Sequence, residues 1–566
     1  MKRLIGILSA AMLAFCLLPS RVVAQVGAPR VFFTDMDSGP NSGGENNNGT
    51  ILSIFGKRFG ATQGSSTVTI GGGATAQVKI WSDTKITVAI GATAQSGPVV
   101  VTVNGVASNN TVTFTVRSGN IRCIATNGND NNSGLWGNCW QNVQNSVFNP
   151  NLASGDIIYV MNGVTATGDT GYSCNICIYG KSGTAQAPIA LVGYPGTTAV
   201  LGSINEQLNV IRVSNLDAVN ADYWTIADLH LQGESAMGIS GHPGTTGWRV
   251  VGNDMTCPNG QDRAYDGCFE GDDMNFVKFY GNTVHHVGTN VPVNNITKLY
   301  HAVYWSTDSN HIDAGWNEVG PSNACRGIQF HSSPIGGSTG FDQFDLHVHD
   351  NYIHDIRCDG INFATVDPSQ GTVEAYNNII VHAGAGPDPL DGQADYACVY
   401  NAGATNTGSP GKGQVKVYNN TMYDCNGRQP HDSGSGGALA SFDSGAGLSI
   451  LAQNNIMDAL SSENYFEDGS VITCDHNLFF GAGPAPGNCT NNVTSDPLFT
   501  NLGARDFHLQ SGSPAIDVGI NTGLTMDIDG NPRPIGAGFD IGAYEFTGGK
   551  AQQQPNPPTN LKATVK

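Results

Sequence analysis

Residues 298–367 show most clearly how the chain is built: they open with KLYHAVYWSTDSNHIDAGWNEVGPSNACRGIQFHSSP (298–334) and close with HVHDNYIHDIRCDGINFATVD (347–367). Short apolar runs alternate in this stretch with turns that contain Asn and Gly. An Asn beside a short apolar segment recurs at Asn317 and Asn351, and a second motif recurs as HAVY, RGIQF and DGINF. The stretch therefore consists of successive copies of one β-strand unit.

The same repeat extends to both sides of this stretch, at intervals of 22 to 42 residues. Intervals of this length are typical of a solenoid, in which each coil pairs its strands with the coils before and after it, about 4.8 Å away. The recurring Asn side chains are predicted to stack as a hydrogen-bonded ladder at one corner of the coils. They are Asn253, Asn282, Asn317, Asn351, Asn378, Asn420, Asn455 and Asn477.

Length and composition fit such an array. The chain has 566 residues, 74 of them Gly, and only 13% are charged, which favours strands and turns over helices. The formal net charge of −20 argues against nucleic acid and anionic membranes as partners. An anionic polysaccharide would need a local basic patch or a bound cation.

Residues 1–24 have the pattern of a secretory signal peptide. Lys2 and Arg3 precede an apolar run, and Val22-Val23-Ala24 supplies small residues for cleavage after Ala24. The apolar run is short for a membrane span, so no membrane insertion is predicted. The mature protein is expected to be secreted, periplasmic or on the cell surface.

The cysteines support export, because cleavage removes Cys16 and leaves 12 of the 13. Zinc is the competing interpretation, but only Cys174-x-x-Cys177 has ligand spacing. Close spacing suggests four disulfides, and the other four cysteines, Cys325, Cys358, Cys398 and Cys425, are expected to join neighbouring coils. The four suggested pairs are Cys123–Cys139, Cys174–Cys177, Cys257–Cys268 and Cys474–Cys489.

Residues 28–117 are predicted to form a separate immunoglobulin-like β-sandwich, because alternating strands are divided by Gly, Asn and Ser turns. IFGKRFG at 54–60, WSDT at 81–84 and GPVVV at 97–101 carry a resemblance to the IPT/TIG family. This resemblance implies a spacer or binding module and no catalysis.

Residues 119–546 resemble secreted right-handed parallel β-helix proteins of the polysaccharide lyase (pectate-lyase-like) superfamily. The resemblance rests on GDIIYV at 155–160, on the repeats, and on SPAID (513–517) and DIGAYE (540–545) near the end. The predicted fold is all-β: a sandwich, then a parallel β-helix with a terminal cap in which Arg533 pairs with Asp517 or Asp540. Residues 547–566 are predicted to be a flexible tail.

Polar residues of neighbouring repeats are predicted to line one groove on this β-helix. Alignment of the repeats places Tyr304, Gln329 and Asn362 at one position of three coils. It places His301, Arg326 and Asp359 at the turn into the same strands, with Asp266 one coil earlier. Strand alternation directs Gln329 and His331 outwards.

The resemblance implies a polysaccharide partner and leaves three functions open. A lyase acting on a uronate chain needs a base (Tyr304, His301 or His331), a cation for the carboxylate (Arg326) and an acid (Tyr304 again), with Gln329, Asp359 and Asn362 binding substrate. Calcium is the one candidate cofactor, with Glu270, Asp272 and Asp273 as its ligands.

A glycoside hydrolase would instead pair Glu270 with Asp272, about 7 Å apart on one strand face. The third alternative is a non-catalytic adhesin or matrix-binding protein, in which these residues only satisfy turns. The lyase is favoured over the hydrolase. No match is found to the Lys and Arg signatures of alginate and chondroitin lyases, nor to the catalytic set of polygalacturonases, so the sequence does not fix the reaction.

Overall fold

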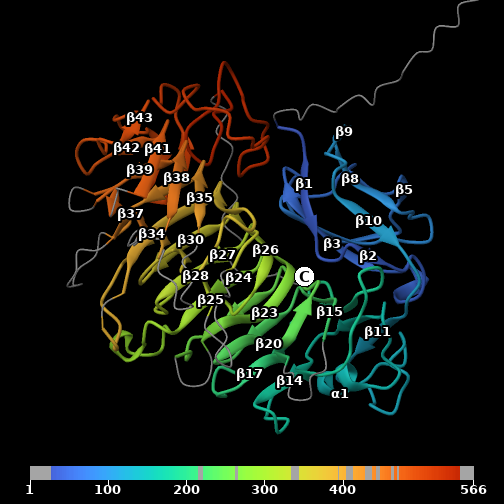
Figure 1. Ribbon diagram of the computed structural model, residues 1–566. Helices are drawn as coiled ribbons and strands as arrows, with labels where there is room; N and C mark the ends of the chain where they lie inside the picture. The colour runs from blue at the N-terminus through green and yellow to red at the C-terminus, as the bar shows by residue number, and fades with distance from the viewer. Residues whose placement is uncertain are drawn as a thin grey trace, which may run out of the picture.

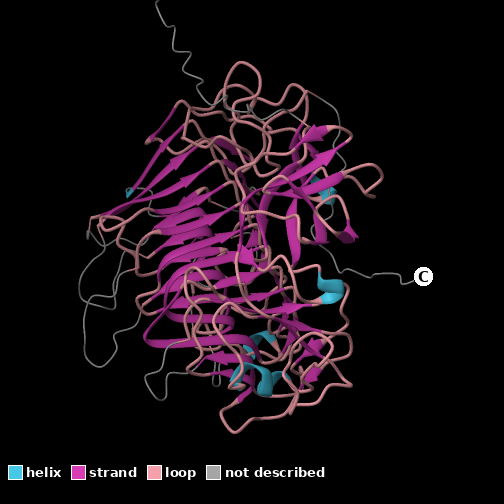
Figure 2. Ribbon diagram, turned by 90° about the vertical axis from the view of Figure 1, so that its right-hand side faces the viewer, coloured by secondary structure: helices cyan, strands magenta, loops and turns pink. Residues whose placement is uncertain are grey.

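The computed structural model describes residues 27–213, 221–261, 266–332, 343–392, 394–402, 412–426, 436–441, 447–460, 464–467 and 471–548. The predicted signal peptide (1–24) and most of the predicted tail (547–566) lie outside these ranges. Within the described ranges, no helix is long and apolar enough to cross a membrane. Strands dominate, as Figure 2 shows.

Two small sheets form the N-terminal sandwich, in blue in Figure 1. The first has the order β1 (Arg30–Thr34), β3 (Ile51–Lys57), β7 (Lys85–Ala89), β6 (Gln77–Trp81) and is antiparallel. The second has the order β2 (Ser38–Gly39), β10 (Thr113–Val116), β8 (Gly97–Val103), β4 (Thr67–Ile70), β5 (Gly73–Ala74), with β9 (Val106–Ala107) beside β8.

The rest of the chain winds as a parallel β-helix, which confirms the predicted fold class. Its largest sheet contains two rows of pairings, joined where β20 and β23 run across both. We name the first row the site row. It consists of β14 (Cys174–Ile178), β17 (Asn209–Val213), β20 (Ser235–Thr246), β23 (Gly267–Tyr280), β25 (His301–Ser306), β28 (Arg326–His331), β31 (Ile361–Phe363), β34 (Tyr396–Asn401), β37 (Gly436–Ser441) and β40 (Phe466–Glu467).

The second row, named the docking row, packs against the sandwich through its first strands, β11 to β23. It consists of β11 (Ile121–Ile124), β12 (Ile157–Val160), β15 (Ile189–Gly193), β18 (Trp224–Ala227), β21 (Arg249–Val251), the second half of β23, β26 (Asn310–Gly315), β29 (Leu346–His349), β32 (Val373–Tyr376), β35 (Gly413–Tyr418), β38 (Leu448–Gln453), β41 (Ile472–Asp475) and β43 (Cys489–Thr490).

A separate sheet closes the third side. It contains β13 (Thr165–Ala166), β16 (Val200–Leu201), β19 (His230–Gln232), β22 (Asp254–Thr256), β24 (Thr283–His285), β27 (Glu318–Val319), β30 (Tyr352–Ile356), β33 (Ile379–Ala383), β36 (Thr421–Tyr423), β39 (Ile456–Asp458) and β42 (Leu478–Phe480). The remaining elements of the described ranges are α1 (Val143–Phe148), the 3-10 turns Glu45–Asn47, Val293–Asn295 and Leu502–Ala504, and a hairpin, β44 (Phe499–Asn501) and β45 (Asp506–Leu509).

The predicted Asn ladder is confirmed, and it fixes one corner of every coil it crosses. Asn351 shows the pattern: its Nδ2 donates to Asn378 Oδ1 (2.9 Å) and to the Ala314 carbonyl (3.0 Å). Its Oδ1 accepts from the backbone and side-chain nitrogens of Asn317, both at 2.9 Å. The residue before each ladder Asn has a left-handed backbone conformation, as at Asp350 (φ 53°), so the chain turns sharply there.

The sandwich packs directly on the docking row and shares a hydrophobic core with it. Ile158 points into the β-helix, whereas Tyr159 points into the sandwich, where its hydroxyl donates to the Ile51 carbonyl (2.9 Å). Phe33 packs on Tyr280, with ring centroids 5.3 Å apart. Strands buried on both faces explain the continuous apolar runs of this part of the sequence.

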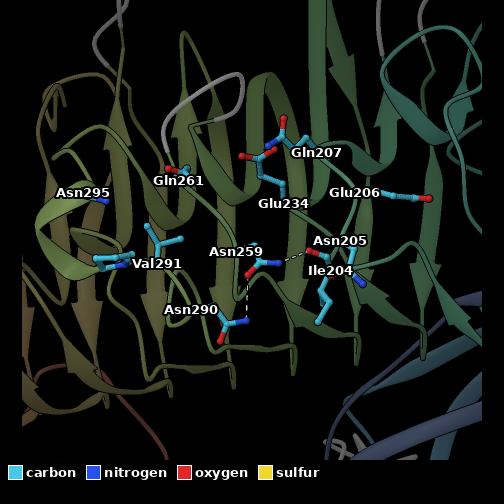
Figure 3. Close-up of a pocket in the computed structure, with 11 residues that line it drawn as sticks. Ile204, Asn205, Glu206, Gln207, Glu234, Asn259, Gln261, Asn290, Val291 and Asn295 are labelled. Atoms are coloured by element: carbon cyan, nitrogen blue, oxygen red, sulfur yellow. Dashed lines mark hydrogen bonds between the residues drawn. The ribbon is translucent and has the colours of Figure 1, made fainter.

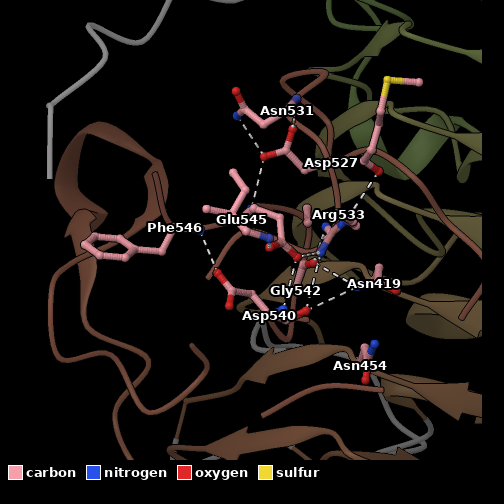
Figure 4. A network of polar contacts seen from close by, with 12 residues as sticks. Asn419, Asn454, Asp527, Asn531, Arg533, Asp540, Gly542, Glu545 and Phe546 are labelled. Atoms are coloured by element: carbon pink, nitrogen blue, oxygen red, sulfur yellow. Dashed lines mark hydrogen bonds and ion pairs between the residues drawn. The ribbon is translucent and has the colours of Figure 1, made fainter. Parts of the chain in front are cut away.

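The terminal cap contains a buried ion pair that corrects one prediction (Figure 4). Arg533 Nη1 lies 2.9 Å from Glu545 Oε1, and both side chains are fully buried. The Asp540 carboxylate instead accepts from the backbone nitrogens of Asp517 (2.7 Å) and Phe546 (2.6 Å). The predicted pairing of Arg533 with Asp517 or Asp540 is therefore corrected: Arg533 forms its ion pair with Glu545 and reaches Asp540 through the carbonyl oxygen of that residue (3.4 Å), because both carboxylates are engaged by turn backbone.

The predicted cysteine pairing is confirmed. The four close pairs are present, and the remaining cysteines form Cys325–Cys358 and Cys398–Cys425. The first of these joins the coils of β28 and β31, which carry the candidate site, and so stabilises their spacing.

Candidate active site

A cavity of about 420 Å³ lies over the site row and contains most of the residues that the sequence singled out. We name it the basic cavity. It is lined by Asp266, Lys298, Leu299, His301, Tyr304, Arg326, Gln329, His331, Asn362, Ala364, Asp395, Tyr400 and Ala402.

Strand register brings these side chains together. His301 on β25 pairs with Arg326 on β28, and Tyr304 pairs with Gln329, which pairs in turn with Asn362 on β31. The predicted alignment of Tyr304, Gln329 and Asn362 is confirmed. Because side chains of one register position project on one face, a single column of polar groups crosses several coils.

The predicted position of Asp266 is wrong by one residue. Gly267, not Asp266, pairs with His301, and Glu270 consequently pairs with Tyr304. The inward apolar side chains set this register, since Phe269 lies opposite Val303. Asp266 still reaches the basic cavity, but from the loop before β23.

Tyr304 and His331 form a contact between adjacent coils. The Tyr304 hydroxyl lies 3.3 Å from His331 Nδ1 and 3.3 Å from the His331 carbonyl oxygen. Burial, with a smaller contribution from Arg326, lowers the pKa of His331 to about 4, so its ring is neutral at neutral pH. Burial raises the pKa of Tyr304, which keeps its proton. The pair thus combines a neutral ring nitrogen with a protonated phenol.

His301 is only 2% exposed and lies beside this pair, with its ring centroid 4.9 Å from that of Tyr304. Burial, together with the charge of Arg326, lowers the pKa of His301 well below its ordinary value. His301 Nδ1 has no hydrogen-bond partner among the described residues. A buried ring nitrogen in this position is available to a ligand.

Arg326 is one of two cations that line the basic cavity, with Lys298, and two carboxylates and a carbonyl hold it in place. Its Nε donates to Asp359 Oδ2 (3.2 Å), its Nη1 to the Lys298 carbonyl (2.9 Å), and its Nη2 lies 3.7 Å from Asp395 Oδ2. Burial and the charge of Asp395 raise the pKa of Asp359 to about 7. Asn362 Nδ2 donates to Asp359 at 2.7 Å, so Asp359 positions other residues and is itself fully buried.

Two further acceptors in the cavity lack partners. Gln329 Oε1 and Asn362 Oδ1 are buried and accept no hydrogen bond from any described residue. Such groups carry a desolvation cost unless a ligand or water donates to them. Their position in the same column as Tyr304 suits a ligand that runs along the coils.

The predicted calcium ligands do not form a cation site. Glu270 and Asp272 face the same side of β23 and pair with Tyr304 and Ser306 of β25. Asp273 comes next and has a left-handed backbone conformation (φ 52°), close to Gly244. Across the described ranges, no group of three or more His, Cys, Asp or Glu residues could hold a metal ion. The three residues therefore do not fit calcium.

Glu270 has a different chemical character. Burial and the charges of Asp266 and Asp272 raise its pKa to about 8, so it is protonated at neutral pH. A protonated carboxyl beside two carboxylates is the arrangement that general acid catalysis needs.

The sequence interpretation missed three polar residues of the basic cavity, namely Lys298, Asp395 and Tyr400. Tyr400 pairs with Asn362 and so continues the column of Tyr304 by one more coil. Extending the repeat alignment through the YACVYN segment would have found it. Lys298 and Asp395 lie in loops, where no repeat pattern marks them.

Comparison with known proteins gives one domain family and several structural neighbours. Residues 37–116 match the IPT/TIG domain, as the sequence motifs predicted. No curated protein matches the chain by sequence.

Several solved structures are similar to parts of this chain. Pectate lyase Pel9A is similar over 76% of this chain and 96% of its own, with 14% identity and a TM-score of 0.49. An alginate lyase from Paenibacillus sp. str. FPU-7 is similar over 58% and 95%, with 14% identity and a TM-score of 0.39. The GH136 lacto-N-biosidase from Eubacterium ramulus is similar over 66% and 68%, with 12% identity and a TM-score of 0.38.

Proposed function

We propose that this protein is a secreted, carbohydrate-active enzyme that cleaves a uronate-containing polysaccharide by β-elimination. The observation that carries the proposal is the neutral Tyr304–His331 pair beside Arg326 in one cavity. Base, acid and cation are the three groups that this reaction requires, and here they lie on adjacent coils.

The residues have separate roles in the reaction. Arg326 binds the uronate carboxylate, which lowers the energy of the charge that develops when the neighbouring carbon loses its proton. His331 accepts that proton, because its lowered pKa keeps the ring neutral. Tyr304 donates its proton to the departing glycosidic oxygen. The carbon–oxygen bond breaks, a carbon–carbon double bond forms, and the other fragment leaves with a hydroxyl group.

Local charge allows an acidic protein to bind an acidic chain. The net charge is −20, but Arg326 and Lys298 both line the basic cavity. The raised pKa of Asp359 reduces the negative charge beneath Arg326. The attraction between these two cations and a bound uronate outweighs the repulsion from distant carboxylates of the protein, because salt screens charges that are more than about 10 Å apart.

Incubation with a panel of uronate and neutral polysaccharides tests the proposal. Rising ultraviolet absorbance from unsaturated ends is the expected result for a uronate polymer. Arg326→Ala should lose at least 100-fold in kcat/KM and stay folded, because Asp359 and Asp395 can both take up protons once the guanidinium is gone. Lys412→Ala, an exposed residue, is the matched control. Full activity of Arg326→Ala would overturn the site.

Glycoside hydrolysis is the second candidate, and the raised pKa of Glu270 is the observation that favours it. Glu270 would be the acid and Asp272, two residues along the same strand, the base. New reducing ends without new absorbance would support this function. Absence of any product would instead favour a binding protein.

A further inference from the structure

The basic cavity contains two hydrogen-bond acceptors that the proposed proton transfers do not use. Gln329 Oε1 and Asn362 Oδ1 accept no hydrogen bond from any described residue, and the two side chains are 5% and 1% exposed. The two residues pair across β28 and β31, so the acceptors lie on adjacent coils, whose strands are about 4.8 Å apart. Buried acceptors in this arrangement require a ligand or water that donates to both.

The acceptor of Asn362 is fixed in place. Its Nδ2 donates to Asp359 Oδ2 (2.7 Å), which also accepts from Arg326 Nε (3.2 Å). Asp359 Oδ1 accepts from the Ala397 nitrogen (3.0 Å). Because each of these neighbours donates to Asp359, the amide of Asn362 keeps its nitrogen towards that carboxylate and its oxygen away from it. Asn362 Oδ1 is therefore left for a ligand.

A second cavity, of about 380 Å³, shows how the protein satisfies amide groups by itself (Figure 3). There Asn290 Nδ2 donates to Asn259 Oδ1 (3.0 Å), and Asn259 Nδ2 donates to the Ile204 carbonyl (2.5 Å). The Asn ladder is satisfied in the same way, as at Asn351. The two acceptors of the basic cavity differ from these structural amides, because a bound molecule must complete them.

Gln329 lies between the cation and the base of the proposed reaction. On β28 it follows Arg326 by three residues and precedes His331 by two. A sugar unit that contacts both Arg326 and His331 therefore covers Gln329 and displaces water from it. The sugar itself must then donate to Gln329, since a buried acceptor that loses its water and gains no partner weakens binding.

The chemistry of a uronate unit identifies the donor. Within a chain such a unit has a carboxylate, ether oxygens and hydroxyl groups, and at neutral pH only the hydroxyl groups donate hydrogen bonds. An O-acetyl ester replaces the hydroxyl hydrogen, so it accepts but cannot donate. A site built to bond a hydroxyl group rejects an analogue without that group strongly, because buried polar atoms are then left unpaired.

We propose that Gln329 and Asn362 bind free hydroxyl groups of the uronate chain, so that the basic cavity selects unsubstituted uronates over O-acetylated ones. The inference rests on the proposed function, because it specifies the substrate of the same site. The two residues determine specificity and transfer no proton. The selection is independent of charge, since acetylation leaves the uronate carboxylate and its contact with Arg326 unchanged.

A polymer and its acetylated form test the inference. Polygalacturonate and polymannuronate are each compared with a highly O-acetylated preparation of the same polymer. For a polymer that is cleaved, kcat/KM should be at least tenfold higher without acetyl groups. Gln329→Met keeps the size of the side chain but removes the acceptor, so it should lower this ratio roughly threefold or more. Gln95→Met, at an exposed position of the sandwich, is the matched control and should leave the ratio unchanged.

The same variants separate hydrogen bonding from simple bulk. Gln329→Glu keeps an acceptor, so it should keep the ratio, while its negative charge lowers kcat/KM on both forms of the polymer. A ratio that Gln329→Met leaves unchanged would show that the ester is excluded by its size. That result, or equal cleavage of both forms by the wild type, would overturn the inference and leave the proposed function standing.

Binding provides a readout that does not depend on cleavage. Short oligosaccharides of both uronates, with and without acetyl groups, are titrated calorimetrically into the wild type. At least tenfold weaker binding of the acetylated form, without cleavage of any polymer, would support the inference and overturn only the proposed function. Equal binding of the two forms would overturn the inference, and binding of none of these oligosaccharides would overturn both.

Discussion

Lys57 of the N-terminal sandwich forms an ion pair with Asp529 of the C-terminal cap, a residue 472 positions later in the chain. Arg58 adds a hydrogen bond from Nη1 to the Asp529 carbonyl (2.8 Å). Figure 1 shows the blue sandwich beside the orange and red end of the chain. The sandwich therefore contacts the β-helix at its side and also at its terminal cap, which the resemblance to a spacer or binding module did not indicate.

Removal of this ion pair should destabilise the whole protein. Lys57→Met keeps the aliphatic stem but leaves the Asp529 carboxylate, whose side chain is 4% exposed, with His508 at 2.9 Å as its remaining charged partner among the described residues. The expected loss is about 2 kcal/mol in the free energy of unfolding. Denaturant unfolding measures it, with Lys412→Met as the exposed control. A double variant with Asp529→Asn should lose less than the sum of the single losses, and additive losses would show that the pair contributes nothing.

The centre of the Asn ladder should be among the most sensitive positions of the fold. Asn351→Ala removes four side-chain hydrogen bonds and leaves the buried Asn317 donors and the Ala314 carbonyl unsatisfied. A loss of roughly 3 kcal/mol follows, since each unsatisfied buried group costs about 1 to 3 kcal/mol. The midpoint of urea unfolding checks it. Asn110→Ala on the sandwich surface should change the midpoint little, and an equal effect of the two variants would contradict the ladder's role.

The ladder also shows which features a sequence can predict. Each ladder Asn occupies a chemically unique corner, so its recurrence is visible although the coils differ in length. The register of Tyr304, Gln329 and Asn362 could be predicted because inward apolar residues flank each of them. The same rule, applied to Phe269, would have placed Glu270 opposite Tyr304 and avoided the error at Asp266.

Contacts between distant segments could not be predicted in this way. Phe33 meets Tyr280, and Lys85 meets Asp228 at 2.8 Å, across more than 100 residues in each case. In the sequence, these contacts are marked only by apolar or charged residues at positions that point outwards from a strand. Such residues are equally consistent with an exposed surface.

His349 should make stability depend on pH in the alkaline range. Burial alone would lower its pKa, but hydrogen bonds to Asp313 and Asp350, both at 2.7 Å, raise it to about 9. In the unfolded chain the pKa is about 6.5. The stabilisation is therefore fully present below pH 6.5 and is lost as pH rises through 9. His349→Gln should be less stable than wild type at pH 6, with a difference that shrinks towards pH 10. A difference that does not vary with pH would rule out the charged form.

Tyr304 should affect the chemical step more than binding. Tyr304→Phe removes the proton donor but keeps the ring packed beside His301, so kcat should fall by about 10² to 10⁴ while KM changes little. Steady-state kinetics on a uronate polymer measures both constants. Tyr418→Phe, which removes a hydroxyl bonded to Glu374 outside the basic cavity, is the control. A change confined to KM would make Tyr304 a binding residue only.

The pH profile of the reaction should separate the two candidate mechanisms. In elimination, His331 must be neutral, so kcat/KM should rise as pH increases through about 4 and show no further dependence on this group near neutrality. Glu270→Gln should then keep most of the activity, because Glu270 transfers no proton. In hydrolysis, Glu270 must be protonated, so activity should fall above about pH 8 and Glu270→Gln should lose at least 100-fold. The two mechanisms predict opposite outcomes for one variant, and His331→Ala, inactive only in elimination, provides the reciprocal test.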